Sequence, residues 1–92
     1  MAGKFKFIVY LHPNAQGQAL GSEGWAKIFV KEDELAEKYG VSVLFRGTPY
    51  GVSESFVTVY ESDKYIDNLS SLIAETGRNQ YIAAARTVTV TT

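Results

Sequence analysis

Alternating apolar and polar residues mark four segments of the chain as β-strands. They are Lys4–His12, Val41–Arg46, Ser55–Glu61 and Tyr81–Thr91. Successive side chains of a strand point to opposite faces of a sheet, so in each segment one face is more apolar than the other. The larger apolar series is expected to face a buried core: Phe5, Phe7, Val9, Leu11, Val41, Val43, Phe45, Val57 and Val59.

Two other segments repeat apolar residues every three or four positions, which is typical of a helix with one buried stripe. The first is predicted over Ser22–Tyr39, with Ser22 as its N-cap. The second is predicted from a cap at Ser62 or Asp63 to about Thr76. An acidic cluster on the first helix is interpreted as a solvated face: Glu32, Asp33, Glu34 and Glu37.

The connection Pro13–Gly21 is predicted to be a loop, because it is small and polar. It is long for a strand-to-helix connection and is suited to cover a pocket. Gly47–Gly51 has turn chemistry, with Pro49 fixing its own backbone angle.

The predicted element order is βαββαβ, over a single domain of residues 1–92. This order is that of the split βαβ, or ferredoxin-like, arrangement. We therefore expect an α+β fold with a four-stranded antiparallel sheet and both helices on one face. Right-handed crossovers place the first and third strands in the centre of that sheet.

The second face of this sheet lacks a helical cover and is expected to be apolar. Its predicted members are Ile8, Tyr10, His12, Leu44, Arg46, Phe56, Thr58 and Tyr60. The last strand adds one of two sets, either Ala83, Ala85 and Thr87 or Ile82, Ala84, Arg86 and Val88. Large exposed apolar patches usually mark interaction sites, so we predict a homodimer packed sheet against sheet.

The layout resembles the dimeric α/β-barrel superfamily, whose small members include stress-responsive A/B-barrel proteins, antibiotic-biosynthesis-type monooxygenases and GYD-type domains. The resemblance rests on the element order and on three segments: Phe7–Tyr10, Leu35–Val41 and Phe56–Glu61. Gly51–Phe56 lacks the Tyr-Asp pair of the GYD signature, so no subfamily is assigned. The resemblance implies a dimer with facing sheets, but a fold does not determine a reaction.

His12 is the single histidine, and its ordinary pKa suits proton transfer near neutral pH. It is the candidate general acid or base, with Tyr10 or Arg46 orienting a substrate. The candidate ligand-binding residues on the same face are Tyr60, Phe56 and Leu44.

Composition excludes several kinds of chemistry. The chain has no cysteine, which rules out thiolate metal sites and disulfides, and no ligand spacing for another metal is present. A strained nucleophile turn, a phosphate-binding fingerprint and a membrane-length apolar run are also missing. The formal net charge is −1, which argues against a nucleic-acid partner.

These observations favour a small dimeric protein that binds an apolar or aromatic molecule on or near the sheet face. No cofactor, metal, nucleic acid or membrane partner is expected, and the location is expected to be cytoplasmic because no signal-peptide pattern is present. The alternatives are a cofactor-independent oxygenase or isomerase that uses His12, a purely structural dimer, and an RNA-binding domain. The last shares the element order, but Glu54 occupies the place of a stacking aromatic.

Overall fold

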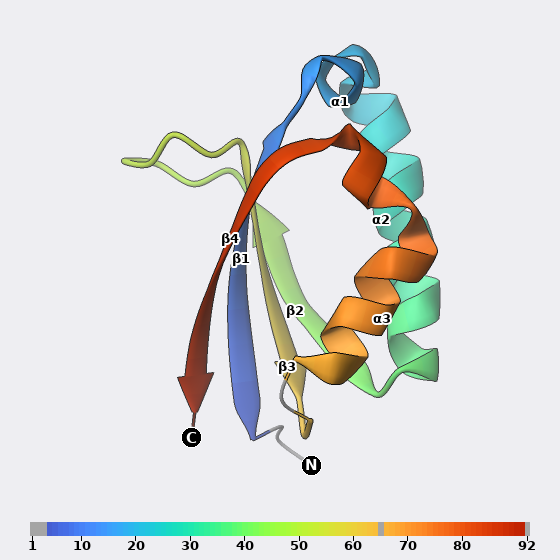
Figure 1. Ribbon diagram of the computed structural model, residues 1–92, viewed down its shortest axis with the longest axis vertical. Helices are drawn as coiled ribbons and strands as arrows, with labels where there is room; N and C mark the ends of the chain where they lie inside the picture. Colours follow the sequence, from blue (N-terminus) through green and yellow to red (C-terminus); the bar gives the residue numbers. More distant parts are fainter. Residues whose placement is uncertain (1–3, 65, 92) are drawn as a thin grey trace.

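The computed structural model describes residues 4–64 and 66–91. In chain order the elements are β1 (Phe5–Pro13), α1 (Ala15–Ala19), α2 (Gly21–Lys38), β2 (Val41–Gly47), β3 (Phe56–Ser62), α3 (Asp67–Thr76), the 3-10 helix η1 (Arg78–Tyr81) and β4 (Ile82–Thr91). The strands form one antiparallel sheet in the order β2-β3-β1-β4, and α2 and α3 lie against one face (Figure 1). This confirms the predicted ferredoxin-like α+β fold with the first and third strands central.

The register of the central strands decides which side chains face the helices. Phe7 lies opposite Tyr60, and Val9 lies opposite Thr58, so these residues share one face. All four are buried. They form the centre of a core that continues into α2 and α3 through Ala36, Leu69 and Leu72.

The β4 register settles the alternative that the sequence left open. Arg86 lies opposite Tyr10, and Val88 lies opposite Ile8. Ala84, Arg86 and Val88 of the second set therefore share the uncovered face of the sheet, which we call the open face. Ile82, predicted with them, instead pairs with Pro13 beyond a register shift and packs against the core.

The segment predicted as a loop before α2 contains the short helix α1. The Asn14 side chain caps it by accepting a hydrogen bond from the Gly17 amide at 2.8 Å. The indole of Trp25 donates to the Gly17 carbonyl, also at 2.8 Å. These contacts fix the segment against α2, because the capping and indole bonds satisfy backbone groups that a loop would leave to water.

Both predicted N-caps are wrong. Helix α2 already begins at Gly21, and Leu20 precedes it without a side-chain cap. Ser62 belongs to β3, where it pairs with Phe5 and Val41, and α3 begins later, at Asp67. Sheet pairing on both sides of Ser62 keeps its backbone extended, which prevents a helix from starting there.

Candidate functional site

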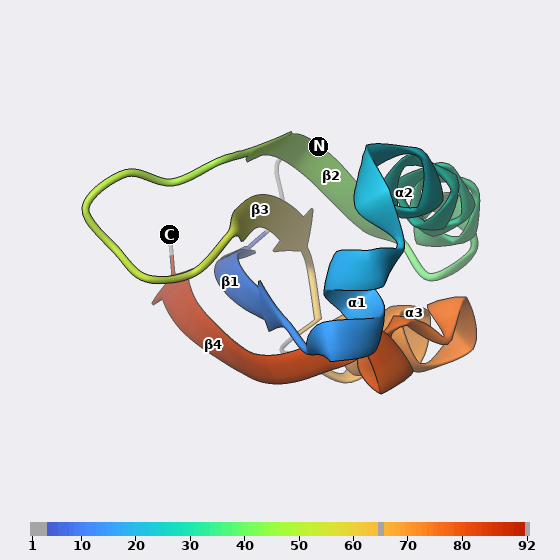
Figure 2. The same cartoon turned by 90° about the horizontal axis from the view of Figure 1, so that it is seen from above.

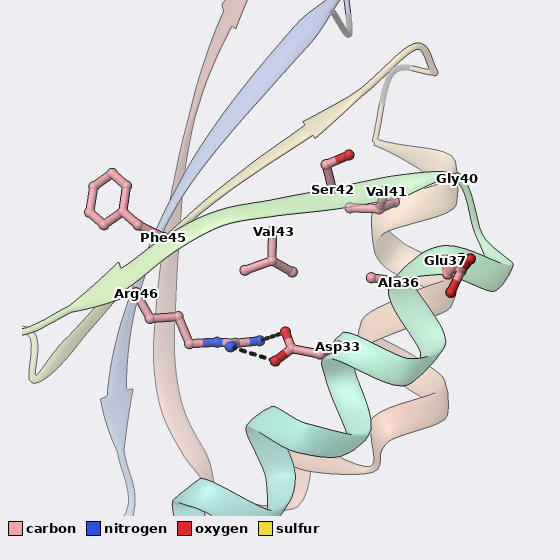
Figure 3. A pocket seen from close by; sticks show the side chains of 9 residues that line it. All are labelled: Asp33, Ala36, Glu37, Gly40, Val41, Ser42, Val43, Phe45 and Arg46. Carbon is pink, nitrogen blue, oxygen red and sulfur yellow. Dashed lines mark hydrogen bonds and ion pairs between the residues drawn. The ribbon is translucent and has the colours of Figure 1, made fainter. Parts of the chain in front are cut away.

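A β-bulge in β2 changes the predicted position of Arg46. Val43 pairs with Tyr60 and Phe45 pairs with Val59, which leaves Leu44 as the extra residue. An extra residue reverses the alternation of faces beyond it. Figure 3 shows the result, with Phe45 on the side of β2 away from α2 and Arg46 directed toward Asp33.

The predicted site residues are divided between the two faces of the sheet. Tyr10 lies on the open face, as predicted, and the exposed His12 follows it on the same side of β1, opposite Ala84. The placement of Arg46, Phe56 and Tyr60 on that face is wrong, because they lie on the helix-covered side. Leu44 is exposed at the bulge.

The prediction that Val57 and Val59 of β3 face the helices is also wrong. Tyr60 and Thr58 take the inward positions of β3, and both are fully buried. A polar contact holds Tyr60 in its inward position, because its hydroxyl donates a hydrogen bond to the Glu32 carboxylate at 2.8 Å. A buried hydroxyl with a charged acceptor is stabilised there, and the two valines consequently lie on the open face.

Glu32 is not part of a solvated acidic face, as the sequence had suggested, but is fully buried. Its two carboxylate oxygens accept from Arg46 Nη2 at 2.9 Å and from Arg78 Nη1 at 2.5 Å. Arg78 Nη1 also lies 2.9 Å from the Tyr60 hydroxyl. These four residues, which we call the buried charge network, connect α2, β2, β3 and η1 beneath the sheet.

The surroundings of Tyr60 and Arg46 in this network shift the pKa values of these two residues. Burial raises the pKa of Tyr60 above its ordinary range, and the Glu32 charge adds to the effect. Burial lowers the pKa of Arg46, but hydrogen bonds and charges from Asp33 and Glu32 outweigh it and leave that pKa raised. Tyr60 therefore stays a neutral donor and Arg46 a cation, so neither supplies a proton-transfer group.

A wide hollow of about 670 Å³ follows the outer edge of the sheet between α2 and β2 (Figure 3). The Arg46–Asp33 ion pair, with a nitrogen-to-oxygen distance of 2.8 Å, closes one end. Because Arg46 is committed to two carboxylates here, its predicted role of orienting a substrate on the open face does not fit its position.

The open face carries an apolar groove of about 540 Å³. It is lined by side chains of β1, β2, β3 and β4 together with two residues of the β2–β3 loop: Lys6, Ile8, Tyr10, Phe45, Pro49, Tyr50, Val57, Val59 and Val90. The loop extends away from the helices on this side of the sheet (Figure 2). Tyr50 is 95% exposed at its tip, which is unusual for so large an aromatic side chain.

Charged groups at the two ends of the open face are paired within the chain. At one end Lys6 Nζ lies 3.0 Å from a Glu61 carboxylate oxygen. At the other, the Arg86 guanidinium lies 4.2 Å from the centre of the Tyr10 ring and 3.1 Å from Glu54. The hydrogen bond from Arg86 lowers the pKa of Glu54. The middle of the face is consequently apolar, and the charges at its two ends are already paired within the chain.

Beside Tyr10, which lines the groove, the structure places Arg86 and its partner Glu54 in addition to the predicted His12. Sequence reasoning missed both, because Glu54 precedes β3 and the face of β4 was undecided. Among the described residues, no three acidic or histidine side chains gather as a metal-binding group. Within the same part of the chain, no helix has the length and apolar character needed to cross a membrane.

No protein-family model matches the sequence, and no curated protein matches it. Solved structures do match in fold. Chlorite dismutase from Candidatus Nitrospira defluvii in complex with imidazole aligns with a TM-score of 0.68 at 13% identity. The alignment covers 97% of this chain but only 40% of the dismutase.

Two smaller proteins align over nearly their whole length. A dimeric ferredoxin-like protein of unknown function from Thermobifida fusca YX has a TM-score of 0.65 at 14% identity, with 96% of this chain and 90% of that chain covered. An uncharacterized NIPSNAP domain protein from Burkholderia xenovorans has a TM-score of 0.58 at 11% identity, with coverages of 96% and 93%. The chain thus has the ferredoxin-like fold. One of the proteins that share this fold is described as dimeric.

Proposed function

We propose that the protein is a homodimer joined through its open faces, with a small apolar or aromatic molecule bound in the groove that the β2–β3 loop partly covers. The observation that carries this proposal is the exposed apolar surface of the open face, where Phe45 of β2 is 56% exposed and Val90 and Val88 of β4 are 41% and 40% exposed. A second copy of the same face would remove these side chains from water.

The charges of the open face favour a second copy over a charged partner. Lys6 and Arg86 are already neutralised by Glu61 and Glu54 within the chain. Two copies can therefore meet through apolar surface without leaving an uncompensated charge at the interface. The dimeric description of the Thermobifida fusca neighbour supports the same assembly.

The experiment places one charge in the middle of the face. Val59→Glu should convert a dimer into a folded monomer, measured as solution mass by light scattering at two protein concentrations. Val30→Glu is the matched control, because Val30 is 57% exposed on α2, far from the open face. A wild-type monomer, or a Val59→Glu dimer of unchanged stability, would overturn the proposal.

A second candidate function is catalysis at the end of the groove where Tyr10 lies. His12 would act as the general acid or base of a cofactor-independent oxygenase or isomerase, beside Tyr10, and Arg86 would take the orienting role first expected of Arg46. The observation that favours it is the Arg86–Tyr10 contact, which fixes a cation and a phenol at one end of an apolar groove. This alternative requires a turnover that His12→Ala abolishes while the dimer mass stays unchanged.

A further inference from the structure

The hollow between α2 and β2, which we call the edge hollow, lies beside an unpaired edge of the sheet. β2 is an outer strand, and in the described part of the chain no strand pairs with its side away from β3. Alternate residues of such a strand direct their backbone N–H and C=O groups outward, where an added strand can bind them. The edge hollow therefore adjoins backbone groups that are available for hydrogen bonds with a partner.

The bulge in β2 limits how long such an added strand can be. β2 keeps a regular register with β3 over Val41–Val43, and the extra residue Leu44 then interrupts it. Bulges of this kind prevent an edge strand from pairing along its whole length. The free edge beside the edge hollow thus suits a short extended peptide rather than the long strand of another sheet.

Two small apolar side chains lie on facing sides of the edge hollow. Val43 is directed from β2 toward α2, and Ala36 of α2 lies across from it (Figure 3). Val43 is half-buried, so part of its surface is open to a partner. Successive side chains of an added strand alternate between the two faces of the sheet. Every second side chain of the peptide consequently points toward α2, and an apolar one there would contact Val43 and Ala36.

Acidic side chains of α2 specify the charge of the partner. Asp33 and Glu37 both line the edge hollow. Asp33 is paired with Arg46, whose guanidinium also pairs with the buried Glu32. Glu37 is exposed, and within residues 4–64 and 66–91 its carboxylate forms no ion pair. A basic side chain of the peptide would supply the missing counter-charge.

We propose that the edge hollow binds a short, extended, basic peptide that adds to β2 as a further strand of the sheet. Backbone hydrogen bonds to Val41–Val43 supply the pairing, as in other cases of strand addition to a sheet edge. An apolar side chain of the peptide packs on Val43 and Ala36, and a lysine or arginine lies beside Glu37.

The β4 strand of a second copy fits this edge less well. Its single cation, Arg86, is already paired with Glu54, and Thr87–Thr91 carries no charge, so β4 has no free partner for Glu37. The peptide site does not depend on the proposed dimer, although Phe45 borders both the edge hollow and the open-face groove.

The probe is the blocked peptide acetyl-Lys-Thr-Val-Thr-Lys-amide, whose lysines and central valine share one face of an extended chain. Its control, acetyl-Glu-Thr-Val-Thr-Glu-amide, reverses the charge and keeps the backbone. Binding is followed by the NMR signals of the backbone amides of Val41–Val43. The basic peptide should shift these signals and bind at least about tenfold more tightly than the acidic one. Equal binding of both peptides, or no shift at millimolar concentration, would overturn the proposal.

The decisive variant is Glu37→Lys, which reverses the charge beside the peptide. It should weaken binding of the basic peptide about tenfold and strengthen binding of the acidic peptide by a similar factor. Glu34→Lys is the matched control, because Glu34 is exposed on the same helix and does not line the edge hollow. Unchanged affinity in Glu37→Lys, or equal effects of the two substitutions, would contradict the assigned position of the peptide.

Methylation of the peptide's own amides tests the strand pairing. Consecutive N–H groups of an extended chain point to opposite edges, so methyl groups on the central valine and on the threonine after it block different edges. One of the two methylated peptides should lose its binding, and the other should keep it. Equal effects of the two methylations would show that the peptide does not pair with β2.

The Val59→Glu variant separates this site from the proposed dimer. It should bind the basic peptide as the wild type does, because Val59 lines the open-face groove and not the edge hollow. Loss of binding in this variant would assign the peptide to the open face and overturn the proposal. Dissociation of a wild-type dimer by the peptide would identify a second copy as the occupant of the β2 edge and would overturn it as well. A wild-type monomer leaves the peptide test intact.

Discussion

Glu32 shows how one side chain can organise the space between helices and sheet. Its carboxylate is surrounded by two arginines and a phenol, and all of its hydrogen bonds are to side chains of other elements. A buried pair of charges contributes little net stability, but the loss of one partner is costly because the other remains buried and unpaired.

Glu32→Gln should therefore destabilise the protein by about 3–5 kcal/mol, because Arg46 and Arg78 lose their shared counter-charge. The free energy of unfolding in urea gives the measurement. Glu34→Gln is the matched control at an exposed position of the same helix and should change stability by less than about 0.5 kcal/mol. Equal effects of the two substitutions would show that the buried charge network does not hold the fold.

The acidic residues of α2 also show where sequence patterns are informative. Glu32 lies at the helical spacing of Trp25, Phe29 and Ala36, so it occupies the buried stripe. Grouping it by charge with Asp33 concealed that periodicity. Its partner Arg78 follows α3, more than forty residues later, and no local pattern connects the two.

At the scale of elements, α2 and α3 are joined at the surface as well as through the core. The Tyr39 hydroxyl donates to Glu75 at 2.5 Å, and Lys38 Nζ lies 3.1 Å from the same carboxylate. These contacts lower the pKa of Glu75 below its ordinary value of 4.5. The hydrogen bond from Tyr39 has the largest effect, and the one from Lys38 follows. The end of α2 is thereby linked to the end of α3 by an interaction that depends on pH.

A carboxyl group with a lowered folded-state pKa stabilises the protein above its unfolded pKa, and this contribution is lost as the pH falls through the folded pKa. The stability difference between wild type and Glu75→Gln should therefore be present at about pH 6 and should disappear toward about pH 3. Thermal unfolding across this range is the measurement. A difference that persists at the acid end would contradict the assigned ionic cause.

The order and type of the main elements could be predicted from the sequence because period-two and helical patterns repeat over many residues. The bulge at Leu44 could not, since an extra residue in β2 depends on how β3 pairs with it. Helix α1 was also missed, because its stability comes from the Trp25 indole and from Asn14 contacts rather than from propensity. The bulge moved Arg46 to the helix-covered face, whereas Tyr60 of β3 lies there with its hydroxyl bound to the distant Glu32.

At the scale of the whole molecule, the two faces of the sheet have different chemistry. The helix-covered face holds ionic and hydroxyl groups, whereas the open face has an apolar centre with compensated charges at its ends. A dimer built on that centre is held by the hydrophobic effect and not by ion pairs between the copies.

The proposed dimer should consequently be insensitive to ionic strength. Raising the salt from about 50 mM to about 500 mM should change the dissociation constant by less than about threefold, because salt screens exposed charges and not apolar contacts. Sedimentation equilibrium at the two concentrations measures this. A dimer that separates steeply with salt would show instead that Lys6 or Arg86 binds across the interface.

The central position of β1 has a consequence for how the chain folds. One side of β1 pairs with β3, but the other is completed only by β4, with Phe5 opposite Thr91. Within this domain β1 is therefore made before its second partner, and one of its hydrogen-bonding edges stays open until β4 has been made. Such distant pairing slows folding, and it makes the interval before β4 docks the time when this protein is most prone to aggregate.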